Sequence, residues 1–170
     1  MKARREARAV PPRMASSTII SRKGIYLQPG QLIATRFPTA VKTILGSCIS
    51  VCLWDEVNAV GGINHFLLPF GTVHADTPGR FGNLAIPMLI EGLQSQGAEL
   101  DNVRAKLFGG ATMIAGGRPR RSHVGVQNLE IAKELLAKAG IPVVSGDTGG
   151  ARGRKIVFNT DTGEVTLWEL

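Results

Sequence analysis

The chain has 170 residues, a length that fits one compact domain. Its hydrophobic content of 44% is that of a globular protein, and no run approaches the roughly 18 apolar residues that a membrane-spanning helix requires. The 2 cysteines exclude the multi-disulfide framework of a small secreted domain, so we expect reduced thiols in a cytoplasmic protein.

The formal net charge of +7 is concentrated at the N-terminus. Residues 1–23 carry seven basic side chains against one acidic, whereas residues 24–170 carry 13 basic and 12 acidic. This charge and a Pro-Pro pair favour a solvated, disordered arm, with a tether to an anionic surface as the alternative. The prolines also interrupt the apolar stretch of a secretory signal. We therefore expect a basic arm at 1–23 and a single domain at 24–170.

Short apolar and β-branched runs, separated by turn-forming residues, predict a strand-rich domain. In chain order we predict strands at 24–27, 32–35, 41–45, 48–54 and 61–69, a loop at 70–80, a helix at 83–96, a strand at 105–108, a helix at 124–139, and strands at 141–144, 154–158 and 164–168. Because strands and helices do not alternate strictly, a doubly wound parallel sheet is disfavoured. An α+β fold is expected instead, a mixed α/β sandwich of β-sheets with flanking helices.

Two features of the predicted helices can be checked against a structure. In the helix at 83–96, Met88 is expected among the inward residues, and Pro87 is tolerable only if it falls in the first turn. The helix at 124–139 is followed by Gly140, a natural C-terminal cap.

Cys48 is the first candidate for chemistry, because it follows a Gly-Ser pair where glycine permits close approach by a substrate. A thiol with a pKa of about 8.5 needs a nearby base or cation to react at neutral pH. His65 is the candidate base, since it lies in a predicted buried strand, whereas His74 and His123 lie in polar loops. A Cys–His dyad is therefore geometrically possible.

The residues alone leave other interpretations open. Cys48 fits a buried core cysteine and His65 a hydrogen-bonded core histidine, while a metal site that includes Cys52 matches no usual zinc spacing. If the pair is catalytic, the thiolate attacks an amide, ammonia leaves and water cleaves the thioester, without a metal or cofactor. Backbone N–H groups of Cys48 and its neighbours are the expected oxyanion donors.

Two glycine-rich segments, 108–113 and 147–154, lack the spacing of nucleotide-binding loops. We interpret them as turns or as walls of an active site. Arg152 and Arg154, in the second segment, are expected to contact an acidic partner or solvent.

Four spaced blocks together resemble the CheD family of chemoreceptor glutamine deamidases. They lie at 45–55, 61–69, 106–113 and 147–154, in the family's order, and the resemblance spans roughly 24–167. It implies that Cys48 is the nucleophile, His65 the catalytic histidine and Thr43 the third catalytic residue. The implied fold is similar to the catalytic domain of cytotoxic necrotizing factor toxins.

The resemblance also implies an activity and partners. The expected enzyme is a cysteine hydrolase, a protein-glutamine glutaminase that converts glutamine to glutamate on methyl-accepting chemotaxis receptors. Expected partners are the cytoplasmic helices of those receptors and a CheC-type phosphatase. The rival hypothesis is a non-catalytic binding module that regulates such a phosphatase or receptor. Nucleic-acid binding through the basic arm ranks last.

Overall fold

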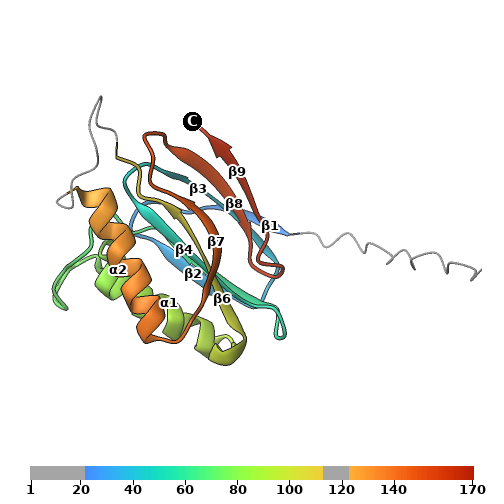
Figure 1. Cartoon of the computed structure of the whole chain (residues 1–170). Coiled ribbons are helices and arrows are strands. Elements are labelled where there is room, and N and C mark those ends of the chain that lie inside the picture. Colours follow the sequence, from blue (N-terminus) through green and yellow to red (C-terminus); the bar gives the residue numbers. More distant parts are fainter. Residues whose placement is uncertain (1–21, 113–122) are drawn as a thin grey trace, which may run out of the picture.

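The domain has three layers, namely a four-stranded sheet, a five-stranded sheet and a pair of α-helices (Figure 1). The computed structural model describes residues 22–112 and 123–170, and in this part of the chain no helix is long and apolar enough to cross a membrane. The described elements are β1 (Lys23–Tyr26), β2 (Leu32–Thr35), β3 (Thr39–Leu45), β4 (Ile49–Asp55), β5 (Val60–Asn64), α1 (Gly82–Ser95), β6 (Val103–Gly109), α2 (Val124–Lys138), β7 (Val143–Thr148), β8 (Arg154–Asn159), β9 (Val165–Glu169) and the 3₁₀ turns Pro78–Arg80 and Leu100–Asn102.

Of the predicted arm at 1–23, residues 1–21 lie outside the described residues. Its last two residues belong to the folded part. Arg22 donates two hydrogen bonds to the carboxylate of Asp161, at 2.8 and 3.0 Å, and Lys23 opens β1. The Arg22 guanidinium holds the pKa of Asp161 below its ordinary value. This ion pair ties the N-terminal edge of the fold to the turn between β8 and β9.

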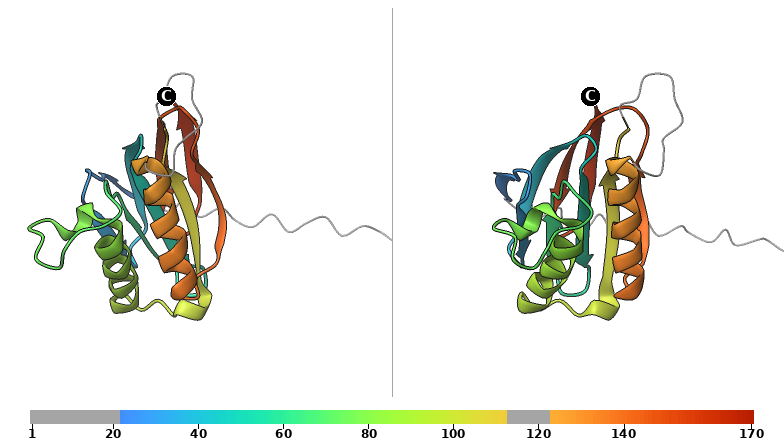
Figure 2. Two further views of the ribbon diagram at one scale, coloured as in Figure 1. Left: turned by 60° about the vertical axis from the view of Figure 1, so that its left-hand side comes forward. Right: turned by 90° about the vertical axis from the view of Figure 1, so that its left-hand side faces the viewer.

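The two sheets are mixed rather than parallel. The first has the order β1-β3-β8-β9, in which β1 and β3 are parallel and the other neighbours antiparallel. The second has the order β2-β5-β4-β6-β7, in which β6 and β7 are parallel and are connected through α2. Figure 2 shows both helices on one face of the second sheet and the first sheet on its other face. The predicted mixed α/β sandwich is therefore confirmed.

The central strand β4 is buried along its whole length, because both faces of its sheet are covered. Val51 and Leu53 pack towards the helices, in one hydrophobic cluster with Leu89 of α1. Cys52 and Trp54 pack between the two sheets, in a second cluster. Since side chains alternate along a strand, the even-numbered residues of this segment face the space between the sheets.

The inward face of α1 differs from the prediction. Pro87 lies inside the helix, beyond its first turn, and Met88 is 38% exposed. The buried stripe runs through Gly82, Ala85, Ile86, Leu89 and Leu93, which follows helical spacing from a start one residue earlier than expected. Pro87 lies on the exposed side of the helix, and because it has no N–H the carbonyl of Asn83 loses its helical hydrogen bond.

The predicted strand at 61–69 is wrong in its length, because β5 ends at Asn64. The side chain of Asn64 accepts a hydrogen bond from the backbone N–H of Val51 at 2.9 Å, in the place of a backbone bond between β4 and β5. His65 therefore lies just beyond the strand, although it is buried as expected. The strand predicted at 141–144 is also displaced, since β7 begins at Val143 and continues into the second glycine-rich segment.

Candidate active site

A buried hydrogen bond joins the two sheets at the candidate site. Thr43 of β3, in the first sheet, lies 2.8 Å from Nδ1 of His65, which follows β5 in the second sheet. Thr43 faces inward because the buried positions of β3 alternate with exposed ones. The two residues are 22 positions apart in sequence and come together only through the packing of the sheets.

The Thr43 hydroxyl determines which nitrogen of His65 carries the proton. Its oxygen also lies 2.9 Å from the carbonyl oxygen of Leu27, which can only accept a hydrogen bond. The single hydroxyl proton is therefore donated to Leu27, so the bond with His65 requires a proton on Nδ1. The neutral ring then has an unprotonated Nε2, which is the form required of a general base.

Cys48 lies on the same side of the second sheet as His65. An antiparallel bridge pairs Ile49 with Phe66, so Ser50 is opposite His65 and Cys48 is its diagonal neighbour. Diagonal neighbours are separated by about 7–8 Å between Cα atoms. No hydrogen bond joins the sulfur to the imidazole within the described residues, so the direct contact at this site is between Thr43 and His65.

The first glycine-rich segment packs against the turn that contains Cys48, here called the Cys48 turn. Gly110 donates its N–H to the carbonyl of Cys48 at 2.8 Å, and Ala111 donates to the carbonyl of Gly46 at 2.9 Å. Gly109 and Gly110 have φ angles of 108° and 69°, and a Cβ at Gly109 would collide with the Cys48 carbonyl. Glycine is thus needed here for backbone conformation and for close approach.

Arg154 joins the second glycine-rich segment to the first. Its guanidinium donates to the carbonyl oxygens of Gly109 and Gly149, at 2.9 and 2.8 Å, and to Asp147 at 2.6 Å. Arg154 is only 6% exposed, so of the two expected contacts solvent is excluded, and its acidic partner is Asp147 of the same chain. Arg152 is the exposed member of the pair and lies 3.4 Å from Glu169.

Asn128 of α2 joins the two halves of the site. It is fully buried, and its Nδ2 donates to the carbonyl oxygens of Ser47 and Leu67, at 3.1 and 2.8 Å. Ser47 directly precedes Cys48, and Leu67 is two residues after His65. The side chain therefore holds these segments together beyond the last bridge of the sheet. Sequence reasoning missed Asn128, although a polar residue on the buried face of an amphipathic helix was a usable signal.

The side chains of Cys48 and His65 are both neutral at pH 7. Burial raises the pKa of the Cys48 thiol, against the opposing influence of its own backbone N–H and the charge of Arg80. Burial lowers the pKa of His65 to about 4. The resting site therefore holds a thiol and a neutral imidazole, rather than a preformed ion pair. Cys52 is more deeply buried, and burial raises the pKa of its thiol as well.

Comparison with known sequences identifies the family. Residues 67–169 match the family described as "CheD chemotactic sensory transduction". A protein of Anaeromyxobacter dehalogenans, named "Probable chemoreceptor glutamine deamidase CheD 1", is 45% identical over 149 residues, which cover 88% of this chain and 86% of that one. The chain belongs to the CheD family.

Two further CheD proteins extend the similarity. The Sulfurimonas denitrificans protein is 37% identical, with coverage of 84% of this chain and 91% of its own. The Agrobacterium fabrum protein is 45% identical, with coverage of 80% and 74%. Among solved structures, the Bacillus licheniformis hypothetical protein YfiH aligns with a TM-score of 0.45 and 15% identity, over 69% of this chain and 49% of that one.

Thr43→Val should impair this CheD protein by removing the oxygen that fixes the His65 tautomer. The Nδ1–H would lose its buried acceptor, at a cost of roughly 1–3 kcal/mol, and we expect kcat to fall by about tenfold to a hundredfold. Thr43→Ser, which keeps the hydroxyl, is the matched control and should retain most activity. Steady-state kinetics checks this, and equal kcat in the valine and serine variants would contradict it.

The stability of the CheD domain should decrease as the pH falls from about 6.5 to about 4. Unfolded His65 takes up a proton near its ordinary pKa of about 6.5, whereas folded His65 does so only near 4. The unfolded state therefore binds the additional proton in this window, which removes up to about 3 kcal/mol of stability. Denaturant unfolding at several pH values, compared with His65→Asn, checks this. If the free energy of unfolding changed with pH in the same way in the wild type and in His65→Asn, the prediction would be refuted.

Asn128→Ala should reduce both stability and kcat. Two carbonyl groups lose their buried donor, which costs roughly 1–3 kcal/mol, and the Cys48 and His65 segments lose their common anchor. We expect kcat to fall about tenfold, which corresponds to a rise of roughly 1.4 kcal/mol in the activation free energy. Leu136→Ala, further along α2, is the control, because it should destabilise by about 2–5 kcal/mol without changing kcat of the folded enzyme. If Asn128→Ala and Leu136→Ala lost kcat equally, the role of Asn128 would be purely structural.

Proposed function

We propose that this CheD-family protein deamidates specific glutamine side chains of methyl-accepting chemotaxis receptors to glutamate and releases ammonia. The observation that carries the proposal is the buried Thr43–His65 pair on the same face as Cys48. It provides a base in a defined tautomer beside a thiol. The relatives named chemoreceptor glutamine deamidases supply the substrate class. Since the helical regions of these receptors lie in the cytoplasm, the enzyme would act there.

The reaction follows from the neutral resting state. As the sulfur of Cys48 bonds to the side-chain carbonyl carbon of glutamine, the thiol proton passes to Nε2 of His65. The imidazolium then gives this proton to the amide nitrogen, the carbon–nitrogen bond breaks, and ammonia leaves a thioester. A water molecule attacks the thioester while His65 takes its proton, and the return of that proton to sulfur regenerates the Cys48 thiol with glutamate as product.

The tetrahedral intermediate needs donors for its oxyanion, and the Cys48 turn offers them. Within the described residues, the backbone N–H groups of Ser47 and Cys48 have no backbone acceptor. The Cys48 N–H lies close enough to its own sulfur to stabilise the thiolate. Donors fixed by the surrounding turn stabilise developing charge without reorganisation, which is the requirement for an oxyanion site.

A CheC-type phosphatase is the second partner that we propose, on the strength of the family resemblance. The alternative function is a binding module that acts on this phosphatase or on a receptor without turnover. The half-buried Cys48 on the same face as the buried pair Thr43 and His65 favours the enzyme, because a binding module needs no base with a controlled tautomer.

The direct test is incubation of the protein with cytoplasmic fragments of chemoreceptors from the same organism. We expect release of ammonia, in proportion to the number of glutamines that peptide mass mapping finds converted to glutamate. Tight binding of a fragment or phosphatase without any ammonia would instead support the binding module.

A further inference from the structure

The chain leaves the candidate site at Leu67 and reaches the protein surface within a few residues. The antiparallel bridge at Ile49 places Leu67 directly opposite Cys48. Phe70 is three residues further on, so its Cα lies at most about 11 Å from that of Leu67, the length of three extended residues. A protein that brings a glutamine to Cys48 therefore comes close to the segment around Phe70.

Three apolar side chains of this segment are exposed to solvent. Phe70 is 66% exposed, Val73 78% and Leu68 42%. Residues 67–73 contain no charged side chain, so charge does not account for the exposure. Single exposed apolar side chains are ordinary on a protein surface, whereas a group of them beside a reactive residue indicates contact with another molecule. The exposed side chains of Leu68, Phe70 and Val73 are here called the apolar loop surface.

The backbone that carries Phe70 is fixed on both sides. Before it, the carbonyl of Pro69 accepts a hydrogen bond from the N–H of Asn83 at 3.0 Å. After it, the N–H of Gly71 donates to the side chain of Asn83, and the same side chain donates to the carbonyl of Gly71, both at 2.9 Å. A Cβ on Gly71 would collide with the ring of Phe81. These contacts fix Phe70 in the free protein, so little conformational freedom is lost when a partner covers its ring.

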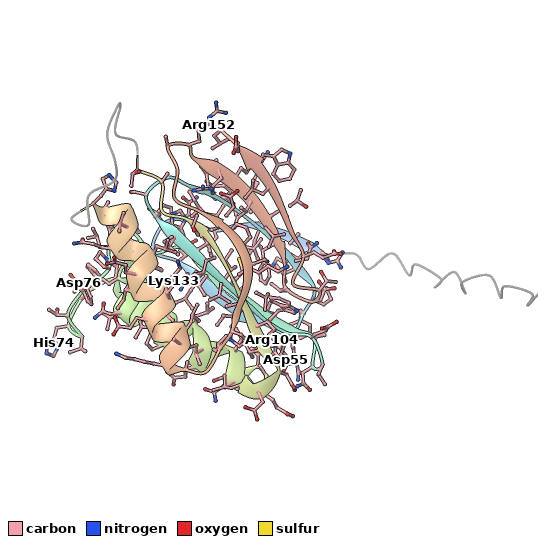
Figure 3. The ribbon with its side chains drawn as sticks, in the orientation of Figure 1. Asp55, His74, Asp76, Arg104, Lys133 and Arg152 are labelled. Carbon is pink, nitrogen blue, oxygen red and sulfur yellow. The ribbon has the colours of Figure 1, made fainter. Side chains whose placement is uncertain are left out.

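An elongated partner fits this arrangement. Figure 3 shows the loop beside the helices, with His74 and Asp76 on the part that projects from the domain. Residues opposite each other in a sheet are about 5 Å apart, so Cys48 and Phe70 are separated by at most about 16 Å. Three turns of an α-helix span about the same length. A helix whose glutamine reaches Cys48 can therefore also cover Phe70.

We propose that the apolar loop surface is a docking surface for the receptor helix that carries the target glutamine. The inference rests on the proposed function, since it takes the receptor as the substrate, and it adds a binding surface outside the reacting residues. Phe70 is the central contact, because an aromatic ring in a fixed position buries a large apolar area. The complementary surface of the receptor is a strip of uncharged, apolar side chains. Binding at this surface should therefore depend little on salt.

The test measures the Kd of a receptor cytoplasmic fragment for the Cys48→Ala protein, which binds the fragment without consuming it. Adding Phe70→Ser should raise Kd about tenfold, by the same factor at low and high salt, and adding Val73→Ser about threefold. Phe70→Leu should keep most of the affinity. Asn83→Ala keeps the ring but removes the hydrogen bonds to Gly71, so an intermediate loss is expected. With Cys48 intact, Phe70→Ser should raise KM and leave kcat unchanged.

Val57→Ser is the matched control. Val57 is 75% exposed and lies between β4 and β5, at the opposite end of β4 from Cys48, so Kd should stay at the value of the parent protein. If Phe70→Ser and Val57→Ser gave the same Kd while the wild type released ammonia, the inference alone would be overturned. If Phe70→Ser weakened binding of a CheC-type phosphatase but not of the receptor fragment, the surface would belong to that partner and the inference would be wrong.

The same measurements separate the docking surface from the deamidase function. Weaker binding of the fragment by Phe70→Ser, together with no ammonia from the wild type, would support the docking surface and overturn the deamidase function. A fragment that the wild type neither binds nor deamidates would overturn both.

Discussion

Cys48→Ala is expected to lower the rate of ammonia release from a receptor fragment by about 10⁴-fold or more, because it removes the sulfur that we propose forms the thioester. The half-buried side chain is next to a turn, so its truncation should leave the fold intact. Binding of the receptor fragment should persist, since the loss is of a bond made only during reaction. Ammonia release and fragment binding, measured on the same preparation, check both statements.

Cys52→Ala is the matched control, as it removes the other thiol of the chain. Cys52 is fully buried between the sheets, and its thiol has a raised pKa. We expect a modest loss of stability from the small cavity and nearly full activity of the folded enzyme. If activity survived in Cys48→Ala and disappeared in Cys52→Ala, the nucleophile would be misassigned.

The sequence predicted the strands and helices well where the signal is local. The β-branched run of β3, the alternation in β4 and the helical spacing before Gly140 are local signals, and these elements are found with small shifts in their ends. Gly140 has a φ of 71°, as a helix C-terminal cap requires. The end of β5 was mispredicted because the Asn64 side chain replaces a backbone bond, which no period in the sequence reveals.

The candidate site is less accessible to sequence reasoning because its contacts are non-local. Thr43 was assigned by family resemblance alone, and its bond to His65 depends on the packing of two sheets. Arg154 was expected to contact an acidic partner or solvent, and arginine is rarely buried without partners. It is buried because three acceptors, two of them carbonyls of glycine-rich segments, converge on its guanidinium. Such convergence becomes visible only in three dimensions.

His65→Asn should lower kcat by about 10²- to 10⁴-fold, the usual contribution of a general acid–base group. Asparagine is the informative substitution here. Its side-chain NH₂ can replace the Nδ1–H that bonds to Thr43, so the link between the sheets is kept, whereas Nε2 is lost without replacement. Steady-state kinetics should therefore show a large loss of kcat, whereas thermal unfolding should show only a small change in Tm. His74→Ala, in the loop that projects beside the helices, should change neither quantity (Figure 3).

The pH dependence of the remaining activity distinguishes the two roles that His65 could have. If it is the base, hydroxide replaces it in His65→Asn, so the residual rate should rise with pH well above neutrality, where the wild-type rate is nearly constant. If it only supports the fold, the variant should lose stability and keep the wild-type pH profile. The pKa of about 4 places protonation of His65 far below neutral pH, so the wild-type base is available throughout the physiological range. The raised pKa of the Cys48 thiol means that, in the proposed mechanism, the sulfur loses its proton to His65 only during the attack.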